Sequence, residues 1–338
     1  MPLISVVMPM RNAARYVGEA VASVLAQPGV DLELVVVDDG STDDSARVVR
    51  GASDPRIKLI SGPKQGIAAA LNAGLAVAQG DYFARCDADD TYEPDRLRHQ
   101  LLLLQTRSDL IAVCGSYVHV TPTGKLIAEQ RWSGVSESIT HELRAGVGRT
   151  HLCTFLVRMS AMRELGGFRP YFIGTEDNDF QLRLGDFQLR LGDFQLRLGD
   201  FQRDPDNTKN EVSTVWYEPR KCYRYRLHGE SITHTQPSSQ RKWLEAQART
   251  FQLQRQSRGW DDLDRDQAAE LPIETDVRAT DTRSEMRDLL LGSAWKLHAQ
   301  GQKGRAIRQG LSALRCDVLG VRTWRSVASL LLKPAGRG

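Results

Sequence analysis

Three features that would assign this chain to a familiar class are missing from its sequence. It has no run of about 18 apolar residues, the length that a membrane-spanning helix needs, so we expect no transmembrane segment. Its five cysteines are scattered and include no Cys-x-x-Cys pair, so neither a zinc site nor a disulfide framework is indicated. The net charge of +3 is too small to indicate nucleic-acid binding by itself. The cysteine pattern leads us to expect a protein of the reducing cytosol.

The composition is that of a soluble globular protein. The 338 residues are 41% hydrophobic and 26% charged, and they suffice for one large α/β domain with a smaller appendage. The chain begins directly with a strand-like apolar run at 3–8, so we expect no signal peptide.

Apolar runs alternate with helical spacings through the first third of the chain. We expect helices at 14–26 and 66–78, and strands at 3–8 (stopping at Pro9), 32–37, 57–60 and 82–86. This alternation is typical of a Rossmann-like, mostly parallel sheet with right-handed crossovers and flanking helices. Ligands of such sheets bind at the carboxyl ends of the strands.

Acidic side chains follow two of the expected strands, at Asp38-Asp39 and at Asp87, Asp89 and Asp90. Three carboxylates within four residues repel one another and cannot all be buried without a partner. A hard cation, Mg²⁺ or Mn²⁺, is the natural partner, because it prefers oxygen ligands and often shares a site between carboxylates and phosphates. The alternative is a solvated acidic turn that caps the helix beginning near residue 95.

The order and spacing of four motifs carry a resemblance to a known family. SVVMPMRN, VVVDDGSTDDS, GIAAALNAGLAVAQGDYFARCDADD and PDRL resemble the family 2 glycosyltransferases of GT-A fold, of the bacterial cell-envelope type, over roughly residues 3–235. The resemblance implies a hexosyltransferase-type enzyme that moves a sugar from a nucleotide diphosphate donor to an acceptor hydroxyl with inversion, usually with Mg²⁺ or Mn²⁺.

The resemblance also implies a donor site. The nucleotide and its sugar would contact residues of the strand-end loops: Pro9, Arg11, Asn12, Asp39, Lys64, Gly66, Asn72, Asp87 and Ala88. Asp39 matches the acid that contacts the base or ribose, and a helix-capping acid is its alternative. For Lys64, Gly66 and Asn72, ordinary roles in a loop and a helix remain open.

The resemblance further implies the metal ligands. Asp89 would bind the cation directly, and Asp87 would reach the ribose, or the metal through water. His228, in the signature YRYRLHGESIT, would be a third ligand or a diphosphate contact.

The middle of the chain would supply the acceptor side. Strands are expected at 111–120 and 127–132, and the apolar run 151–157 would form the floor of the acceptor pocket. Gly166-Gly167-Phe168 followed by Glu176-Asp177 looks like the family's GGF…xED motif. The resemblance makes Asp177 the preferred candidate base, and the neighbouring Glu176 is the other candidate. Burial and the neighbouring acid would raise the base's pKa. Alternatively, both acids stabilise a helix N-terminus.

Residues 179–202 contain three consecutive copies of DFQLRLG followed by Asp-Phe-Gln, which the family pattern holds once. We expect a helix for the first copy, because it follows the Glu-Asp motif. The later copies would lengthen that helix or loop out, with a return loop at 203–210, as an insertion without a role of its own.

We predict a catalytic domain at 1–235, with a nucleotide-sugar half at 1–110 and an acceptor half at 111–235, and a helical region at 236–338. Residues 303–338 contain eight Lys or Arg and one acid. The segment 322–332 suits an interfacial helix on an anionic membrane, at the inner face of the plasma membrane. Packing on the catalytic domain, or a dimer contact, is the alternative.

We expect a UDP-sugar as donor, a saccharide or lipid-linked acceptor in cell-envelope polysaccharide or glycolipid synthesis, and no nucleic-acid partner. Two other functions remain open. A nucleotidyltransferase would be expected to carry a Gly-rich phosphate loop after the first strand, and the loop MPMRN contains no glycine. A non-catalytic sugar-nucleotide-binding protein would have been inactivated by the repeat.

Overall fold

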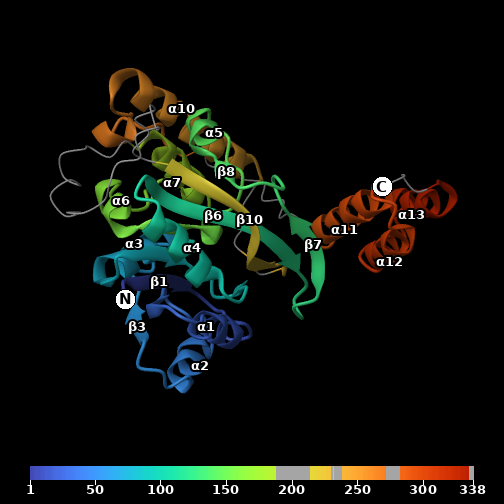
Figure 1. Ribbon diagram of the computed structural model, residues 1–338, viewed down its shortest axis with the longest axis horizontal. Helices are drawn as coiled ribbons and strands as arrows, with labels where there is room; N and C mark the ends of the chain where they lie inside the picture. The colour runs from blue at the N-terminus through green and yellow to red at the C-terminus, as the bar shows by residue number, and fades with distance from the viewer. Residues whose placement is uncertain (188–213, 230, 232–237, 272–281, 335–338) are drawn as a thin grey trace. The chain divides into compact units, whose positions relative to one another are not determined.

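The computed structural model describes residues 1–187, 214–229, 231, 238–271 and 282–334 (Figure 1). The chain forms two compact units. The first consists of Met1–Ser116, Arg131–Tyr223 and Trp243–Glu270, and the second of Tyr117–Gln130, Arg224–Lys242 and Leu271–Gly338. Three segments of each unit alternate along the chain, so the chain passes from one unit to the other five times. The catalytic domain at 1–235 and the helical region at 236–338 stay a prediction.

The first unit opens with the predicted alternation of strands and helices. Its elements are β1 (Leu3–Met10), α1 (Val17–Leu25), β2 (Asp31–Asp38), α2 (Ser45–Gly51), β3 (Ile57–Ser61), α3 (Ile67–Val77) and β4 (Tyr82–Arg85). The four strands are parallel in the order β3-β2-β1-β4. This part of the sheet confirms the α/β prediction.

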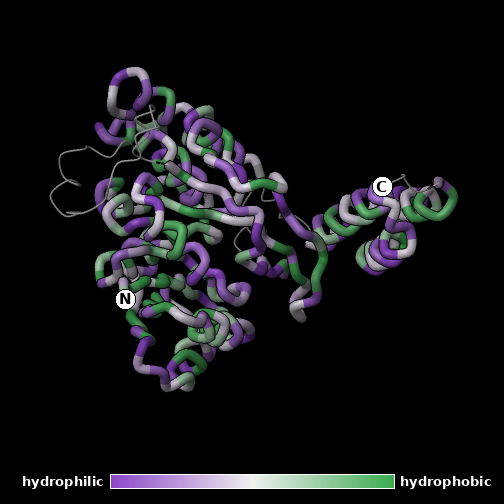
Figure 2. The backbone as a smooth tube through the Cα atoms, viewed as in Figure 1, coloured by the Kyte–Doolittle hydropathy of each residue, from purple (hydrophilic) through white to green (hydrophobic). Residues whose placement is uncertain are grey.

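The core of this half lies between β1, β2 and helix α3. Val7 and Val37 are fully buried against the Ala-rich face of α3. A side chain at Gly74 would place its Cβ 2.4 Å from Cγ1 of Val7, so the helix can approach the sheet this closely only with glycine there. Figure 2 shows β1 as one of the most hydrophobic segments of the chain.

We predicted that the first strand stops at Pro9, but β1 continues to Met10. Pro9 pairs with Val37 of β2, whereas the pairing of β1 with β4 ends at Val7. At Pro9 only one neighbouring strand remains, so the missing N–H of proline is tolerated there.

The sheet then becomes mixed, because β9 lies antiparallel to both β4 and β6. Its order is β3-β2-β1-β4-β9-β6-β10-β5, with β7 on β6 and β8 on β10. The remaining elements that lie wholly or partly in the first unit are β5 (Thr91–Tyr92), α4 (Arg96–Thr106), β6 (Leu110–Val120), β8 (Glu137–Ser138), α5 (Thr140–Arg144), η1 (Leu152–Thr154), β9 (Leu156–Arg158), α6 (Met159–Glu164), α7 (Glu176–Asp186), β10 (Thr214–Arg226), α10 (Ser238–Arg258) and η2 (Leu263–Arg265).

Helix α7 confirms the prediction for the first repeat copy. It begins at Glu176, and it buries Phe180 and Leu184 in the core that also holds Phe168. Asp179 is fully buried and ion-paired with Arg169 and Arg183. Of the second copy only Asp186, which ends α7, and the buried Phe187 are described. The rest of that copy, the third copy and the expected return loop at 203–210 lie outside the described residues.

In its described residues, the second unit contains the ends of β6 and β10, strand β7, the start of α10 and the C-terminal helices α11, α12 and α13. Strand β7 (Leu126–Gln130) is antiparallel to the end of β6. Helices α11 (Thr282–Ala299), α12 (Lys303–Leu314) and α13 (Val321–Leu332) contact one another in the red part of the ribbon (Figure 1). In the described part of the chain, no helix is both long and apolar enough to cross a membrane.

Candidate active site at the carboxyl ends of the strands

The loop after β1 is tied to the acidic turn after β2. The backbone N–H of Asn12 donates to Oγ of Ser41 over 3.0 Å, and Oδ1 of Asn12 accepts the N–H of Thr42 over 2.8 Å. Asn12 has a φ of 51°, a left-handed conformation that asparagine tolerates better than most residues. Pro9, Arg11 and Asn12 are thereby held next to the Asp38-Asp39 turn.

Asp39 holds the loop between β3 and α3. Its two carboxylate oxygens accept the backbone N–H groups of Lys64 over 2.6 Å and of Gly66 over 2.9 Å, and the residue is only 4% exposed. The structure therefore brings three of the predicted nucleotide-binding residues together. Each carboxylate oxygen can accept a second hydrogen bond, so Asp39 retains capacity for a ligand.

The predicted nucleotide contact Asn72 instead has a partner within the protein. Its Nδ2 donates to the carbonyl of Phe168 over 2.7 Å, and its Oδ1 accepts the N–H of Phe168 over 2.8 Å. Gly167 has a φ of 71°, and a Cβ there would lie 2.5 Å from Oδ1 of Asn72. These contacts favour the alternative of an ordinary helix residue, here one that holds the Gly-Gly-Phe turn.

Arg85 connects the two predicted groups of acids. Its Nε and Nη2 donate to the two oxygens of Asp87 over 2.6 and 3.1 Å, and its Nη1 donates to Oε1 of Glu176 over 3.0 Å. Glu176 is 91 residues away in the sequence. Sequence reasoning missed Arg85, although a charged residue at the end of a buried strand is the signal that could have revealed it.

The two acids of the Glu-Asp motif have different surroundings. Glu176 is 3% exposed, and its Oε2 has no hydrogen-bond partner among the described residues. Burial raises the pKa of Glu176 to about 7, with Arg85 opposing the shift and Asp177 adding to it. The side chain of Asp177 is 28% exposed and lies 3.8 Å from Nδ1 of His151, a neighbour that sequence reasoning did not single out. Of the two, Asp177 is the one that a bound molecule can reach.

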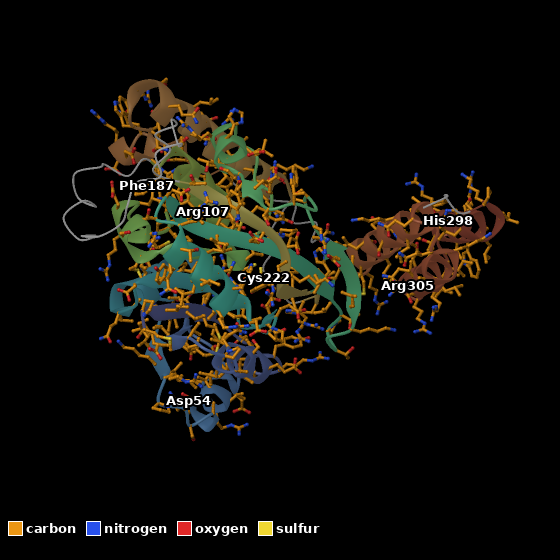
Figure 3. All side chains as sticks on the ribbon, in the orientation of Figure 1. Asp54, Arg107, Phe187, Cys222, His298 and Arg305 are labelled. Carbon is orange, nitrogen blue, oxygen red and sulfur yellow. The ribbon has the colours of Figure 1, made fainter. Side chains whose placement is uncertain are left out.

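Two tyrosines fix the backbone around the Asp87 turn. The hydroxyl of Tyr92 donates to the carbonyl of Arg85 over 2.8 Å, and the N–H of Asp87 donates to the hydroxyl of Tyr223 over 3.0 Å. The guanidinium of Arg96, the Arg of the PDRL motif, is 1% exposed and lies 3.9 Å from the ring centroid of Tyr92. Cys222, labelled in Figure 3, precedes Tyr223 and is buried. The turn that carries the acids is thus rigidly supported.

The acids fit a divalent cation only in part. Asp87 and Asp89 are half-buried and Asp90 is 2% exposed. Among the described residues, no three His, Cys, Asp or Glu side chains gather closely enough to hold a metal ion. Burial raises the pKa of Asp87 despite the opposing effect of Arg85, so a nearby positive charge would stabilise its ionised form. This arrangement suits a cation that takes one or two carboxylates and completes its shell with phosphate oxygens and water.

His228 belongs to the second unit. It is 8% exposed, and its carbonyl accepts the N–H of Ser231. In the same unit, Arg224 and Arg226 donate to the carbonyls of Gly124 and Pro122 in the β6–β7 turn. The role of His228 as a third metal ligand stays a prediction.

Comparison with solved structures identifies the class of fold. The S. aureus TarS 1–349 structure in complex with UDP-GlcNAc superposes with a TM-score of 0.54 at 14% identity, covering 99% of this chain and 93% of that one. The fold is that of the GT-A glycosyltransferases, as the sequence predicted.

The family follows from sequence comparison. The model of glycosyl transferase family 2 matches residues 5–166. An uncharacterized glycosyltransferase of Rickettsia prowazekii is 30% identical over 244 residues, which cover 69% of this chain and 67% of that protein. The chain belongs to glycosyl transferase family 2.

Two larger relatives carry descriptive names. The hyaluronan synthase and the chondroitin synthase of Pasteurella multocida are 33% and 29% identical over 244 residues, which cover 71% of this chain. The aligned region spans only 22% of the length of each of these synthases.

Proposed function

We propose that this chain is a metal-dependent inverting glycosyltransferase that moves a sugar from a UDP-sugar to an acceptor hydroxyl in cell-envelope polysaccharide or glycolipid synthesis. The observation that carries the proposal is the contact of Arg85 with both Asp87 and Glu176, because it joins the donor-side acids to the acceptor-side acids at the ends of the strands. Membership of the family and the UDP-GlcNAc in the TarS structure support the choice of donor.

In the proposed reaction, Asp177 accepts the proton of the acceptor hydroxyl. The acceptor oxygen forms a bond to the anomeric carbon while the bond from that carbon to the diphosphate breaks, and the electron pair leaves with the diphosphate. Asp89 and Asp87 are the residues that would hold Mg²⁺ or Mn²⁺, which would neutralise charge on the leaving diphosphate. Glu176 is too enclosed to meet the acceptor and instead borders Asp177.

Sugar transfer from a panel of nucleotide sugars, with Mn²⁺ or Mg²⁺ and lipid-linked or saccharide acceptors, tests the proposal. Asp177→Asn should lose about 10²- to 10⁴-fold in kcat, the usual contribution of a general base, while still binding the donor. Asp89→Ala should lose activity together with cation-dependent donor binding. Asp54→Asn, a change beside the start of β3 away from the strand ends, is the matched control and should keep activity. Donor binding without turnover in the wild type would support the binding-protein alternative.

We also propose that α13 and the residues between α12 and α13 bring the enzyme to an anionic membrane. Exposed apolar side chains (Val318, Leu319, Val321, Trp324 and Leu332) stand among exposed arginines (Arg315, Arg322 and Arg325) in this unit. Residues 303–338 contain eight Lys or Arg and one acid, so anionic lipid headgroups complement the charge of this surface.

Flotation with vesicles tests the membrane contact. The protein should float with vesicles containing phosphatidylglycerol and stay behind with phosphatidylcholine alone. Replacing Leu319 and Trp324 by serine should abolish flotation, and the matched double change of the exposed Leu102 and Leu253 in the first unit should not. Equal flotation with neutral vesicles, or no effect of the first pair, contradicts the proposal.

A further inference from the structure

Arg85 lies where a strand of the sheet core ends and the acidic turn begins. Its side chain is 8% exposed, and it contacts carboxylates that belong to β4's following turn and to the first turn of α7. We propose that Arg85 is a positioning residue that sets the carboxylate of Asp87 for the donor and, through Glu176, the placement of Asp177 for the acceptor. The inference rests on the proposed function and adds a residue to it.

Each nitrogen of the Arg85 guanidinium donates a hydrogen bond to a carboxylate. Nε and Nη2 form a two-pronged contact with both oxygens of Asp87, which fixes the plane of that carboxylate. Nη1 points to Glu176. A lysine could supply the same charge but not two parallel hydrogen bonds and a third to another residue. The fork therefore determines orientation as well as charge.

The backbone of the turn from Arg85 to Asp87 does not depend on the Arg85 side chain. The carbonyl of Arg85 and the N–H of Asp87 are already held by the hydroxyls of Tyr92 and Tyr223. Burying a guanidinium is costly unless it is paired, and an apolar residue would complete the strand at lower cost. What the guanidinium adds is the orientation of two side chains, Asp87 and Glu176.

The link to the acceptor side runs through the start of helix α7. Glu176 is its first residue, and Asp177 follows it with a partly exposed side chain. Because Glu176 is buried and held by Arg85, it fixes the start of the first turn from which Asp177 projects, while the ion pairs of Asp179 hold the other end of that turn. Without that contact, Asp177 would keep its solvent access but lose its fixed direction, and misplacement of a reacting group by about 1 Å can cost about 10²-fold in rate.

The decisive variant is Arg85→Lys, with Arg158→Lys as its matched control. Arg158 is an arginine of β9 that pairs with Tyr82 at the opposite end of β4 and donates to backbone carbonyls, so it is remote from the acids. Arg85→Lys should weaken binding of the UDP-sugar by about 10-fold and lower kcat by about 10- to 100-fold, from the loss of charge-assisted hydrogen bonds. Arg158→Lys should change neither the donor affinity nor kcat by more than about 2-fold, because Arg158 shares no partner with Asp87 or Glu176.

Glu176→Gln separates the two halves of the inference, and it preserves the shape of the side chain should Arg85→Lys fold poorly. It should lower kcat while leaving donor affinity within about 2-fold of the wild type, because only the contact to the acceptor side is weakened. In the Arg85→Lys background the same change should have little further effect on kcat. A role of Arg85 in stability alone would instead make the two changes additive.

The measurements are titration calorimetry with UDP-sugar with and without Mn²⁺, steady-state kinetics, and hydrogen exchange of residues 174–180. Exchange there should accelerate in Arg85→Lys and not in Arg158→Lys. Suppose that the wild type is active but Arg85→Lys behaves like Arg158→Lys, or that the effects of Arg85→Lys and Glu176→Gln add in the double variant. Either result overturns the role of Arg85 and leaves the proposed function standing. A wild type that neither binds nor transfers any nucleotide sugar overturns the proposed function, and the role of Arg85 with it.

Discussion

Replacing Glu176 by glutamine should change how the stability of the protein depends on pH. The carboxyl of Glu176 is buried, and burial raises its pKa from 4.5 to about 7. Below pH 4.5 the group is protonated in the folded and the unfolded chain, so it does not affect the equilibrium. As the pH rises to 7, the unfolded chain releases the proton while the folded one retains it, and the folded state becomes less stable.

The size of the effect follows from the shift. About 2.5 pH units at about 1.4 kcal/mol each amount to roughly 3 kcal/mol of lost stability, complete above pH 7. The opposing attraction of Arg85 is already contained in this pKa. Because glutamine carries no charge, Glu176→Gln should escape this loss. The variant should therefore gain about 3 kcal/mol on the wild type between pH 4.5 and pH 7.5.

Urea denaturation at a series of pH values measures this difference. The control is Glu164→Gln, which removes one carboxylate from the exposed end of α6 and should keep a constant offset from the wild type. If the free energies of unfolding of wild type and Glu176→Gln run parallel from pH 4.5 to 7.5, Glu176 is not held in the environment described above, and the reasoning fails.

Two further substitutions test the strand-end loops. Asn72→Ala removes both hydrogen bonds to Phe168 and should lower the free energy of unfolding by about 1–3 kcal/mol. Urea denaturation measures this change, with Asn178→Ala as the control. An unchanged denaturation midpoint of Asn72→Ala would refute the prediction. Asp39→Asn replaces one acceptor by a donor that faces a loop N–H, so UDP affinity in calorimetry should fall by about 10-fold or more, from an unpaired buried donor. Undiminished UDP binding by the Asp39→Asn variant would remove Asp39 from the nucleotide site.

Most of the fold could be predicted from the local pattern of apolar and polar residues in the sequence. The buried strands of the first unit agree with the predicted ones to within two residues, and the first repeat copy is helical as expected. The pattern failed where one strand changes its surroundings along its length. Local patterns do not reveal that β10 is continuous over Thr214–Arg226, because the half-buried Glu218 and the exposed Arg220 and Lys221 interrupt the apolar pattern between its buried ends.

The candidate site was predictable in its acids but not in what holds them. The topology placed Asp39 and Asp87 at strand ends, because parallel strands put their carboxyl ends at one edge. The partner of Asp87 was not predictable, since Arg85 interrupts an apolar strand pattern and contacts an acid 91 residues further along. The contact of Asn72 with Phe168 spans 96 residues and has no local signature either.

That contact bears on how enzymes of this kind can be recombined. Asn72 lies in the half of the first unit that precedes residue 111, and Phe168 lies in the half that follows it. A chimera that exchanged one half for that of a relative would place a foreign backbone opposite Asn72, and the reciprocal pair of hydrogen bonds would survive only if the new turn offered an N–H and a carbonyl at the same spacing. The two halves are therefore not interchangeable modules, and a graft intended to change the acceptor has to carry its matching residue on α3.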